Sequence, residues 1–137
     1  MENSPLKPRT ILLNAAFEGD LERLKKSASE VDSVDGDGLA TVFRNTKDED
    51  GRCALHHAAA GGKLDVLKYL IEEIKLIDDI DVKDNSGGTP LSCAAMNGRM
   101  AAVSYLRRIG ANPEIANNKN ITPLHHDAMN GSLFLYN

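Results

Sequence analysis

The chain has 137 residues, a net charge of −4, 42% hydrophobic and 26% charged residues, and only 4% aromatic residues with no Trp. This length suits one domain with a core of its own. The acidic balance excludes the basic surface that nucleic acid or anionic lipid requires. No apolar stretch reaches signal-peptide length at the start or the ~20 residues of a membrane span elsewhere. We therefore expect a soluble protein of the cytoplasm or nucleus, with no nucleic-acid or membrane partner.

A leucine followed seven residues later by a glycine recurs four times along the chain. The four leucines are separated by 43, 36 and 33 residues, and they are Leu12, Leu55, Leu91 and Leu124. A period in the thirties is typical of stacked repeats of short helices. The low aromatic content fits a core of Ala and Leu between closely packed helices.

The first repeat is predicted over residues 10–28. Residues 1–9 carry two prolines and are expected to form a disordered leader. Thr10 is the expected cap of the first helix, and Gly19 its end. Its apolar stripe is formed by residues at helical spacing, namely Leu12, Leu13, Ala16 and Phe17. Asp20 is expected to cap a second, antiparallel helix.

Residues 29–46 form an insertion that explains the long first interval. The segment is either an extended loop or a short extra helix over 39–44 laid across the stack. Leu39, Val42 and Phe43 lie at positions i, i+3 and i+4 of that stretch. This spacing favours the helix.

Two further repeats are predicted over residues 48–83 and 84–116, and a partial fourth over 117–137. In the third repeat, Thr89 is the expected N-cap and Pro90 fits the first helical turn. The predicted outer helices cover residues 63–75 and 99–109. Asn120 stands where a turn glycine is expected, and Asn is the next best residue at positive φ. The fourth repeat has too few residues for its second helix.

This repeat pattern resembles the ankyrin repeat, whose consensus is D-x-x-G-x-T-P-L-H-x-A-A-x-x-G. The matching stretches are Asp84–Gly98, Asp48–Gly62, Gly110–Asn112 and Thr122–His125. The resemblance implies an all-α ankyrin-repeat solenoid of about three and a half repeats over residues 10–137, with an incomplete C-terminal repeat. Ser92 replaces the usual His, so one polar tie between neighbouring turns is expected to be missing.

The whole chain also resembles the amino-terminal part of plant proteins in which ankyrin repeats precede a TPR domain. The phrases that carry this likeness are Phe17–Leu21, Leu55–Ala59 and Tyr69–Glu73. The TPR part is absent from this sequence. A chaperone-tail binding role, which would belong to that part, is therefore not implied.

Residues suited to catalysis or metal binding do not converge in the sequence. The histidines form two adjacent pairs, His56–His57 and His125–His126, two repeats apart, and neither pair has the i, i+4 spacing of a zinc helix. Hydrogen bonding within the scaffold is favoured over a metal or catalytic role. Cys53 and Cys93 lack a CxxC spacing, which indicates free thiols in a reducing compartment. We expect no enzyme activity, no cofactor and no metal.

The resemblance implies that a partner contacts the hairpin tips and the inner-helix residues just before each stop glycine. The predicted partner-binding residues are Glu49, Asp50, Arg52, Ala60, Gly61, Asn85, Ser86, Gly88, Met96, Asn97, Asn118, Lys119, Ile121, Met129 and Asn130. The two methionines suit an adaptable contact surface, but padding of the neighbouring inner helix is an equal alternative.

The predicted function is a non-catalytic scaffold or adaptor that binds another, unidentified protein on the concave ankyrin surface. The alternative is a truncated fragment of a larger ankyrin-repeat/TPR protein with little independent function. Terminal repeats normally carry a polar capping helix, whereas this chain ends with the apolar stretch Leu133–Tyr136. The alternative predicts marginal stability or self-association through the uncapped C-terminal edge.

Overall fold

The computed structural model describes residues 7–129, and these form helices joined by turns, with no strand among them. The α-helices, in chain order, are α1 (Pro8–Glu18), α2 (Leu21–Asp35), α3 (Leu39–Asn45), α4 (Ala54–Gly61), α5 (Leu64–Lys68), α6 (Pro90–Met96), α7 (Met100–Arg108) and α8 (Pro123–Met129). A π-helical turn over Tyr69–Glu73 continues α5, and a 3₁₀ turn covers Leu76–Asp79. The all-α solenoid expected from the sequence is confirmed.

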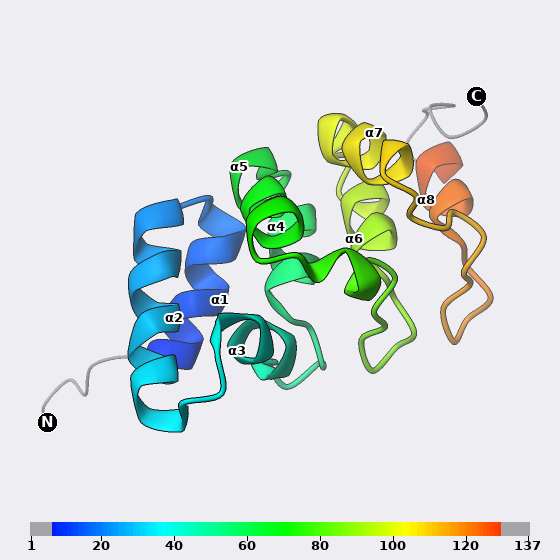
Figure 1. Cartoon of the computed structure of the whole chain (residues 1–137). Helices are drawn as coiled ribbons and strands as arrows, with labels where there is room; N and C mark the ends of the chain where they lie inside the picture. Colours follow the sequence, from blue (N-terminus) through cyan, green and yellow to red (C-terminus); the bar gives the residue numbers. More distant parts are fainter. Residues whose placement is uncertain (1–6, 130–137) are drawn as a thin grey trace, which may run out of the picture.

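The helices form antiparallel pairs that stand side by side in a row, from α1–α2 to α6–α7, followed by α8 (Figure 1). The inner helices make the continuous contact: α1 packs on α4, α4 on α6, and α6 on α8. The turns that precede α4, α6 and α8 all project from the same edge of the row (Figure 1). Each repeat therefore presents one inner helix and one hairpin to the same side.

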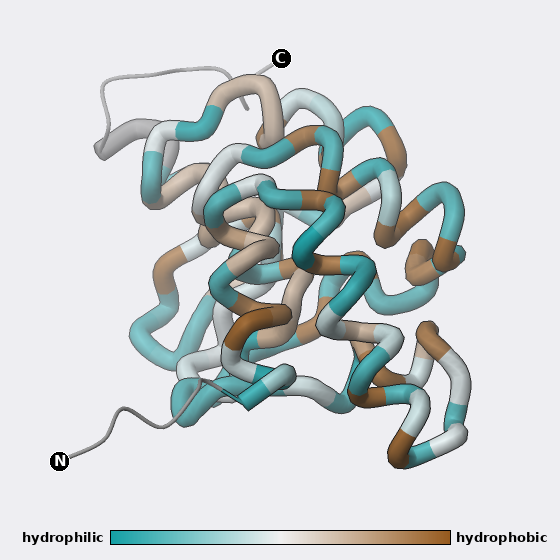
Figure 2. Tube along the Cα trace, turned by 90° about the vertical axis from the view of Figure 1, so that its left-hand side faces the viewer, coloured by the Kyte–Doolittle hydropathy of each residue, from teal (hydrophilic) through white to brown (hydrophobic). Residues whose placement is uncertain are grey.

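Small residues permit this close stacking, as predicted. Four alanines of the inner helices have no exposed surface, namely Ala58, Ala59, Ala94 and Ala95. Larger aliphatic side chains such as Leu67, Leu70 and Leu106 fill the layer between inner and outer helices. Viewed from the α1–α2 end, hydrophobic and hydrophilic stretches alternate along the same helices (Figure 2). This alternation is the pattern of helices that bury one face in a core.

Helix α1 begins three residues earlier than the sequence suggested. Thr10 was the expected N-cap, but the cap is Lys7 and Pro8 occupies the first turn. Proline has its φ already fixed near the helical value, and it loses no hydrogen bond at this position. Residues 8 and 9 therefore belong to the first repeat. The rest of the predicted leader, apart from Lys7, lies outside the described residues.

Helix α2 is longer than predicted and takes up the first part of the insertion. It runs to Asp35 because Ala28 and Val31 continue its buried face, and it ends at Gly36 with φ 71°. The extra helix predicted over 39–44 is confirmed as α3. Its Phe43 is 1% exposed and meets the ring of Tyr69 edge-on, with the ring centroids 6.1 Å apart. The insertion thus packs against the outer helix of the second repeat.

The outer helix expected over 63–75 is not uniform. It changes from α to π geometry at Tyr69, where Ile74 donates to the Tyr69 carbonyl, and it ends before Lys75, which has φ 70°. The caps of the third repeat follow the prediction. Thr89 Oγ1 accepts the Ser92 N–H at 3.2 Å, and Ser92 Oγ accepts the Thr89 N–H at 2.8 Å. Asn120 adopts φ 61°, as expected for a turn position.

Candidate functional site

One polar residue at the base of each hairpin holds that hairpin in shape. In all three, a side-chain oxygen accepts the backbone N–H groups two and four residues further on, at 2.8–3.0 Å. The residues are Asp48, Asp84 and Asn117. Burial would raise the pKa of Asp84, but hydrogen bonds from Gly88, Arg52 and Ser86 outweigh it and hold that pKa below its ordinary value. Asp84 is therefore a charged anchor for its hairpin.

Asparagines tie the hairpins to one another in series. Asn85 donates its backbone N–H to the Asp50 carbonyl at 2.9 Å and its side-chain amide to the Glu49 carbonyl at 3.1 Å. Asn118 repeats this one hairpin later, donating to the Ser86 carbonyl at 2.8 Å and to the Asn85 carbonyl at 3.2 Å. The hairpin tips therefore form one connected edge, along which the backbone positions are fixed.

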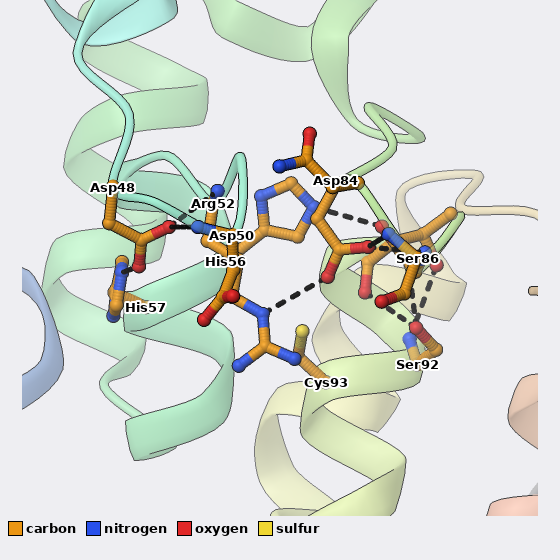
Figure 3. Close-up of polar contacts among 12 residues, drawn as sticks. Asp48, Asp50, Arg52, His56, His57, Asp84, Ser86, Ser92 and Cys93 are labelled. Carbon is orange, nitrogen blue, oxygen red and sulfur yellow. Dashed lines mark hydrogen bonds and ion pairs between the residues drawn. The ribbon is translucent and has the colours of Figure 1, made fainter.

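Two side chains of the second repeat reach the third. His56 Nδ1 accepts the Cys53 N–H at 3.2 Å, which leaves the hydrogen on Nε2 to be donated to the Gly88 carbonyl at 3.0 Å. Burial lowers the pKa of His56, consistent with this neutral form. Arg52 Nε lies 3.0 Å from Asp84 Oδ2, and dashed lines in Figure 3 mark this ion pair and the hydrogen bond between His57 and Asp48. These groups position the hairpins that border the site.

Two hollows lie on the inner-helix side. The first, of about 620 Å³, lies between α1 and the hairpin that precedes α4; Arg9, Glu49 and Asp50 are among its lining residues. The second, of about 420 Å³, lies across the ends of α1, α4 and α6, and its lining includes Phe17, Ala60 and Met96. Asn14 and His57 line both hollows. We call this pair of adjoining hollows the groove.

A family model described as "Ankyrin repeats (3 copies)" matches residues 12–117. The chain belongs to the ankyrin-repeat family. Ankyrin repeats form modules for protein–protein interaction.

Curated relatives carry the same ankyrin segment within longer proteins. The chain is 36% identical over 108 residues to the mitochondrial liver isoform of glutaminase from Rattus norvegicus, covering 77% of this chain and 16% of that protein. It is 30% identical over 110 residues to transient receptor potential cation channel subfamily A member 1 from Homo sapiens, and the match covers 77% of this chain and 10% of that protein. It is 39% identical over 70 residues to 26S proteasome non-ATPase regulatory subunit 10 from Dictyostelium discoideum, and the match covers 51% of this chain and 29% of that protein.

The ankyrin positions predicted to bind a partner fall into two groups. Those that line the groove are Glu49, Asp50, Arg52, Ala60, Met96 and Asn97. Those that line neither hollow are Gly61, Asn85, Ser86, Gly88, Asn118, Lys119 and Ile121. In this second group the asparagine amides hold neighbouring hairpins, Gly88 accepts from His56, and Gly61 packs against α1. Met129 is the last residue of α8, and Asn130 lies outside the described residues.

The groove also contains residues that the sequence did not single out. Phe17 was assigned to the apolar stripe of the first helix, but its side chain is 45% exposed, like that of Met96 at 44%. Both residues stand five positions after the leucine of their repeat, as does Ala60. Asn14 and His57 stand two positions after it. Aligning the first repeat with the other three, position by position from the leucine, would have found Phe17 and Asn14.

Three of the four histidines have scaffold partners, in line with the interpretation favoured from the sequence. Besides His56, His57 Nε2 lies 2.8 Å from Asp48 Oδ2, and His125 Nδ1 accepts the Thr122 N–H at 3.0 Å. Between residues 7 and 129, no group of three or more metal-ligating side chains converges. In the same range, no helix has the length and apolar character to cross a bilayer.

Proposed function

We propose that this chain is a non-catalytic scaffold or adaptor whose groove binds a segment of another protein. The observation that carries the proposal is the exposure of Phe17 inside the groove. A Phe side chain that is 45% exposed in a hollow can bury considerable apolar area against a partner. Aromatic side chains in such positions commonly contribute much of the binding energy at protein interfaces.

The architecture around the groove supports the same proposal. The hairpin on its border is fixed by Asp48 and by the donors of Asn85, so binding would cost little ordering of the backbone. The groove residues Asn14, Glu49 and Asp50 make no side-chain hydrogen bond or ion pair among residues 7–129 that would tie them to the scaffold. Their side chains are therefore available to a partner.

An enzymatic role finds less support. The glutaminase relative is an enzyme by its name, but the matched segment is 16% of its length. Three of the four histidines, His56, His57 and His125, are bound within the repeat scaffold by Cys53, Gly88, Asp48 and Thr122. Function in a fold of this kind must be argued from a site.

The proposal includes the cytoplasm or the nucleus as the compartment. Cys53 and Cys93 are buried free thiols, and burial raises the pKa of both, to about 12 for Cys93. Unpaired, unreactive thiols suit a reducing environment. Imaging of the tagged chain in its native cell tests this part, and a signal confined to the secretory pathway would contradict it.

Site-specific crosslinking in the native cell tests the groove. A photoreactive amino acid at Asn14, where the two hollows meet, is expected to capture a discrete partner protein. The matched control is the same amino acid at Ser29, an exposed position on the outer helix α2. Identical crosslinked proteins from both positions, or none from Asn14, would contradict the proposal.

A second proposal follows from the lengths of the relatives. The segment is 10–29% of the three relatives described above, which supports an ankyrin unit that works inside a longer protein. We propose an ankyrin–TPR protein as one such longer protein. On this proposal the isolated chain has little function of its own and self-associates. A sharp, concentration-independent unfolding transition, together with a monomer in sedimentation, would contradict it.

A further inference from the structure

We propose that the groove selects a short partner segment that carries a Lys or Arg side chain beside a large apolar side chain. This inference rests on the proposed function and names the chemistry of the partner. The cation would lie against the carboxylates of Glu49 and Asp50, and the apolar side chain between Phe17 and Met96. The two subsites correspond to the two hollows of the groove.

The charges around the first hollow are mostly committed to the scaffold. Arg9 is paired with Asp35 at 2.6 Å, and Asp48 accepts from His57 and from two backbone N–H groups. By contrast, the carboxylates of Glu49 and Asp50 form no salt bridge among residues 7–129. Asp50 attracts Arg52 at longer range, but the Arg52 guanidinium is paired with Asp84. Of the lysines and arginines in this lining, only Lys47 forms no salt bridge with a carboxylate within the described range. Two carboxylates against one amine favour a cationic ligand.

The acidic subsite is held in place by its backbone. The carbonyls of Glu49 and Asp50 both accept from Asn85, and the Asp50 N–H is donated to Asp48. Both side chains are exposed, so a partner's cation can approach without a rearrangement of the hairpin. Such preorganisation lowers the entropy lost on binding.

The second hollow offers an apolar subsite. Phe17 and Met96 are 45% and 44% exposed, and Ala60 lies at the equivalent position of the repeat between them. The lining contains one arginine, Arg52, which is paired with Asp84, and one carboxylate, Glu18, which lies 3.9 Å from Arg23. An apolar side chain in this hollow therefore does not bury an arginine that lacks a carboxylate partner.

Asn14 connects the two subsites. It lines both hollows, and its side-chain amide can donate to and accept from the backbone of a bound segment. An acidic or phosphorylated segment would instead bring negative charge against Glu49 and Asp50. Like charges in contact cost binding free energy, so such segments are disfavoured.

Selection from a random dodecapeptide library on the native chain tests the inference. The enriched peptides are expected to combine Lys or Arg with a large apolar residue. They should bind the double variant E49K/D50K about tenfold more weakly or worse, and F17A likewise. Binding should also weaken as NaCl rises from about 0.05 to about 0.5 M. The control variant D37K/D78K has the same change of charge at exposed positions outside the groove and should bind as the wild type does.

The result separates this inference from the proposed function. Peptides without a basic residue, or peptides that bind E49K/D50K as tightly as D37K/D78K, overturn the inferred chemistry. If such peptides still lose binding to Asn14→Trp, the groove remains a binding site and only its specificity is wrong. If no enriched peptide responds to any groove variant, both fail. Thermal unfolding of each variant confirms that it is folded.

Discussion

At the scale of single residues, buried polar groups decide the shape of the hairpins. His56 shows this most clearly, because its two ring nitrogens connect its own helix cap to the next hairpin. It has no exposed surface, and its charged form would have to be buried. Burial accordingly lowers its pKa from the ordinary value of 6.5.

This lowered pKa predicts how stability depends on pH. Below about pH 6.5 the unfolded chain binds a proton at His56 that the folded chain does not, so the free energy of unfolding falls as the pH decreases. The decline continues until the folded-state pKa is reached. His56→Gln should flatten the profile between about pH 7 and pH 5; some slope remains because burial also lowers the pKa of His126. Denaturant unfolding across this range checks it, and parallel profiles would refute it.

Asp84 should be the most sensitive carboxylate of the chain. Its side chain is 2% exposed and accepts from Ser86, Gly88 and Arg52. Asp84→Asn replaces one acceptor oxygen by a donor and leaves buried groups unpaired, which should cost about 1–3 kcal/mol in the free energy of unfolding. Asp50→Asn, at an exposed position, should change it by less than about 0.5 kcal/mol. Equal effects in urea unfolding would show that Asp84 is not an anchor.

At the scale of elements, the sequence predicted the helices that are determined by residues within or next to them. The short helix α3 followed from the spacing of Leu39, Val42 and Phe43, and the cap of α6 from Thr89 and Pro90. The π turn at Tyr69 was not predicted, because the apolar residues of this stretch continue at helical spacing through it. The groove was not predicted either. Whether Phe17 is buried or exposed depends on which helix lies beside it.

The link between the third and fourth repeats lacks the histidine that joins the second to the third. Ser92 closes its own cap but does not reach the Ile121 carbonyl, the counterpart of the Gly88 carbonyl. Ser92→His should restore the tie and raise the free energy of unfolding by about 0.5–1 kcal/mol. Ser92→Ala, which leaves the Thr89 N–H without its acceptor, should lower it by about 1 kcal/mol. A destabilised Ser92→His variant in urea unfolding would be evidence against this equivalence.

The contact between α1 and α4 depends on a glycine. A Cβ atom on Gly61 would overlap the carbonyl oxygen of Phe17, which is part of the backbone and cannot rotate away. Gly61→Ala should therefore cost about 3 kcal/mol, despite the better helix propensity of alanine. Gly36→Ala is the control, since it has positive φ but no atom within 4 Å of the added carbon, and should cost about 1 kcal/mol. Similar costs for the two variants in thermal unfolding would contradict the proposed clash.

At the scale of the whole molecule, the row of repeats lets a substitution change stability at one end without changing binding in the groove. In a stack each repeat contacts only its neighbours, so changes are felt mainly at the nearest interface. The groove lies across α1, α4 and α6, whereas the link that Ser92 fails to make lies between α6 and α8. Variants at Ser92 should therefore alter stability and leave the affinity for a groove ligand unchanged.

The central claim is that a partner protein occupies the groove. The most direct measurement is the affinity of the crosslinked partner for Asn14→Trp, which fills the junction of the two hollows, compared with Ser29→Trp on the outer helix α2. We predict that Asn14→Trp weakens binding by about tenfold or more, because the indole occupies the space of the ligand, and that Ser29→Trp binds like the wild type. Equal affinities of the two folded variants would contradict the account.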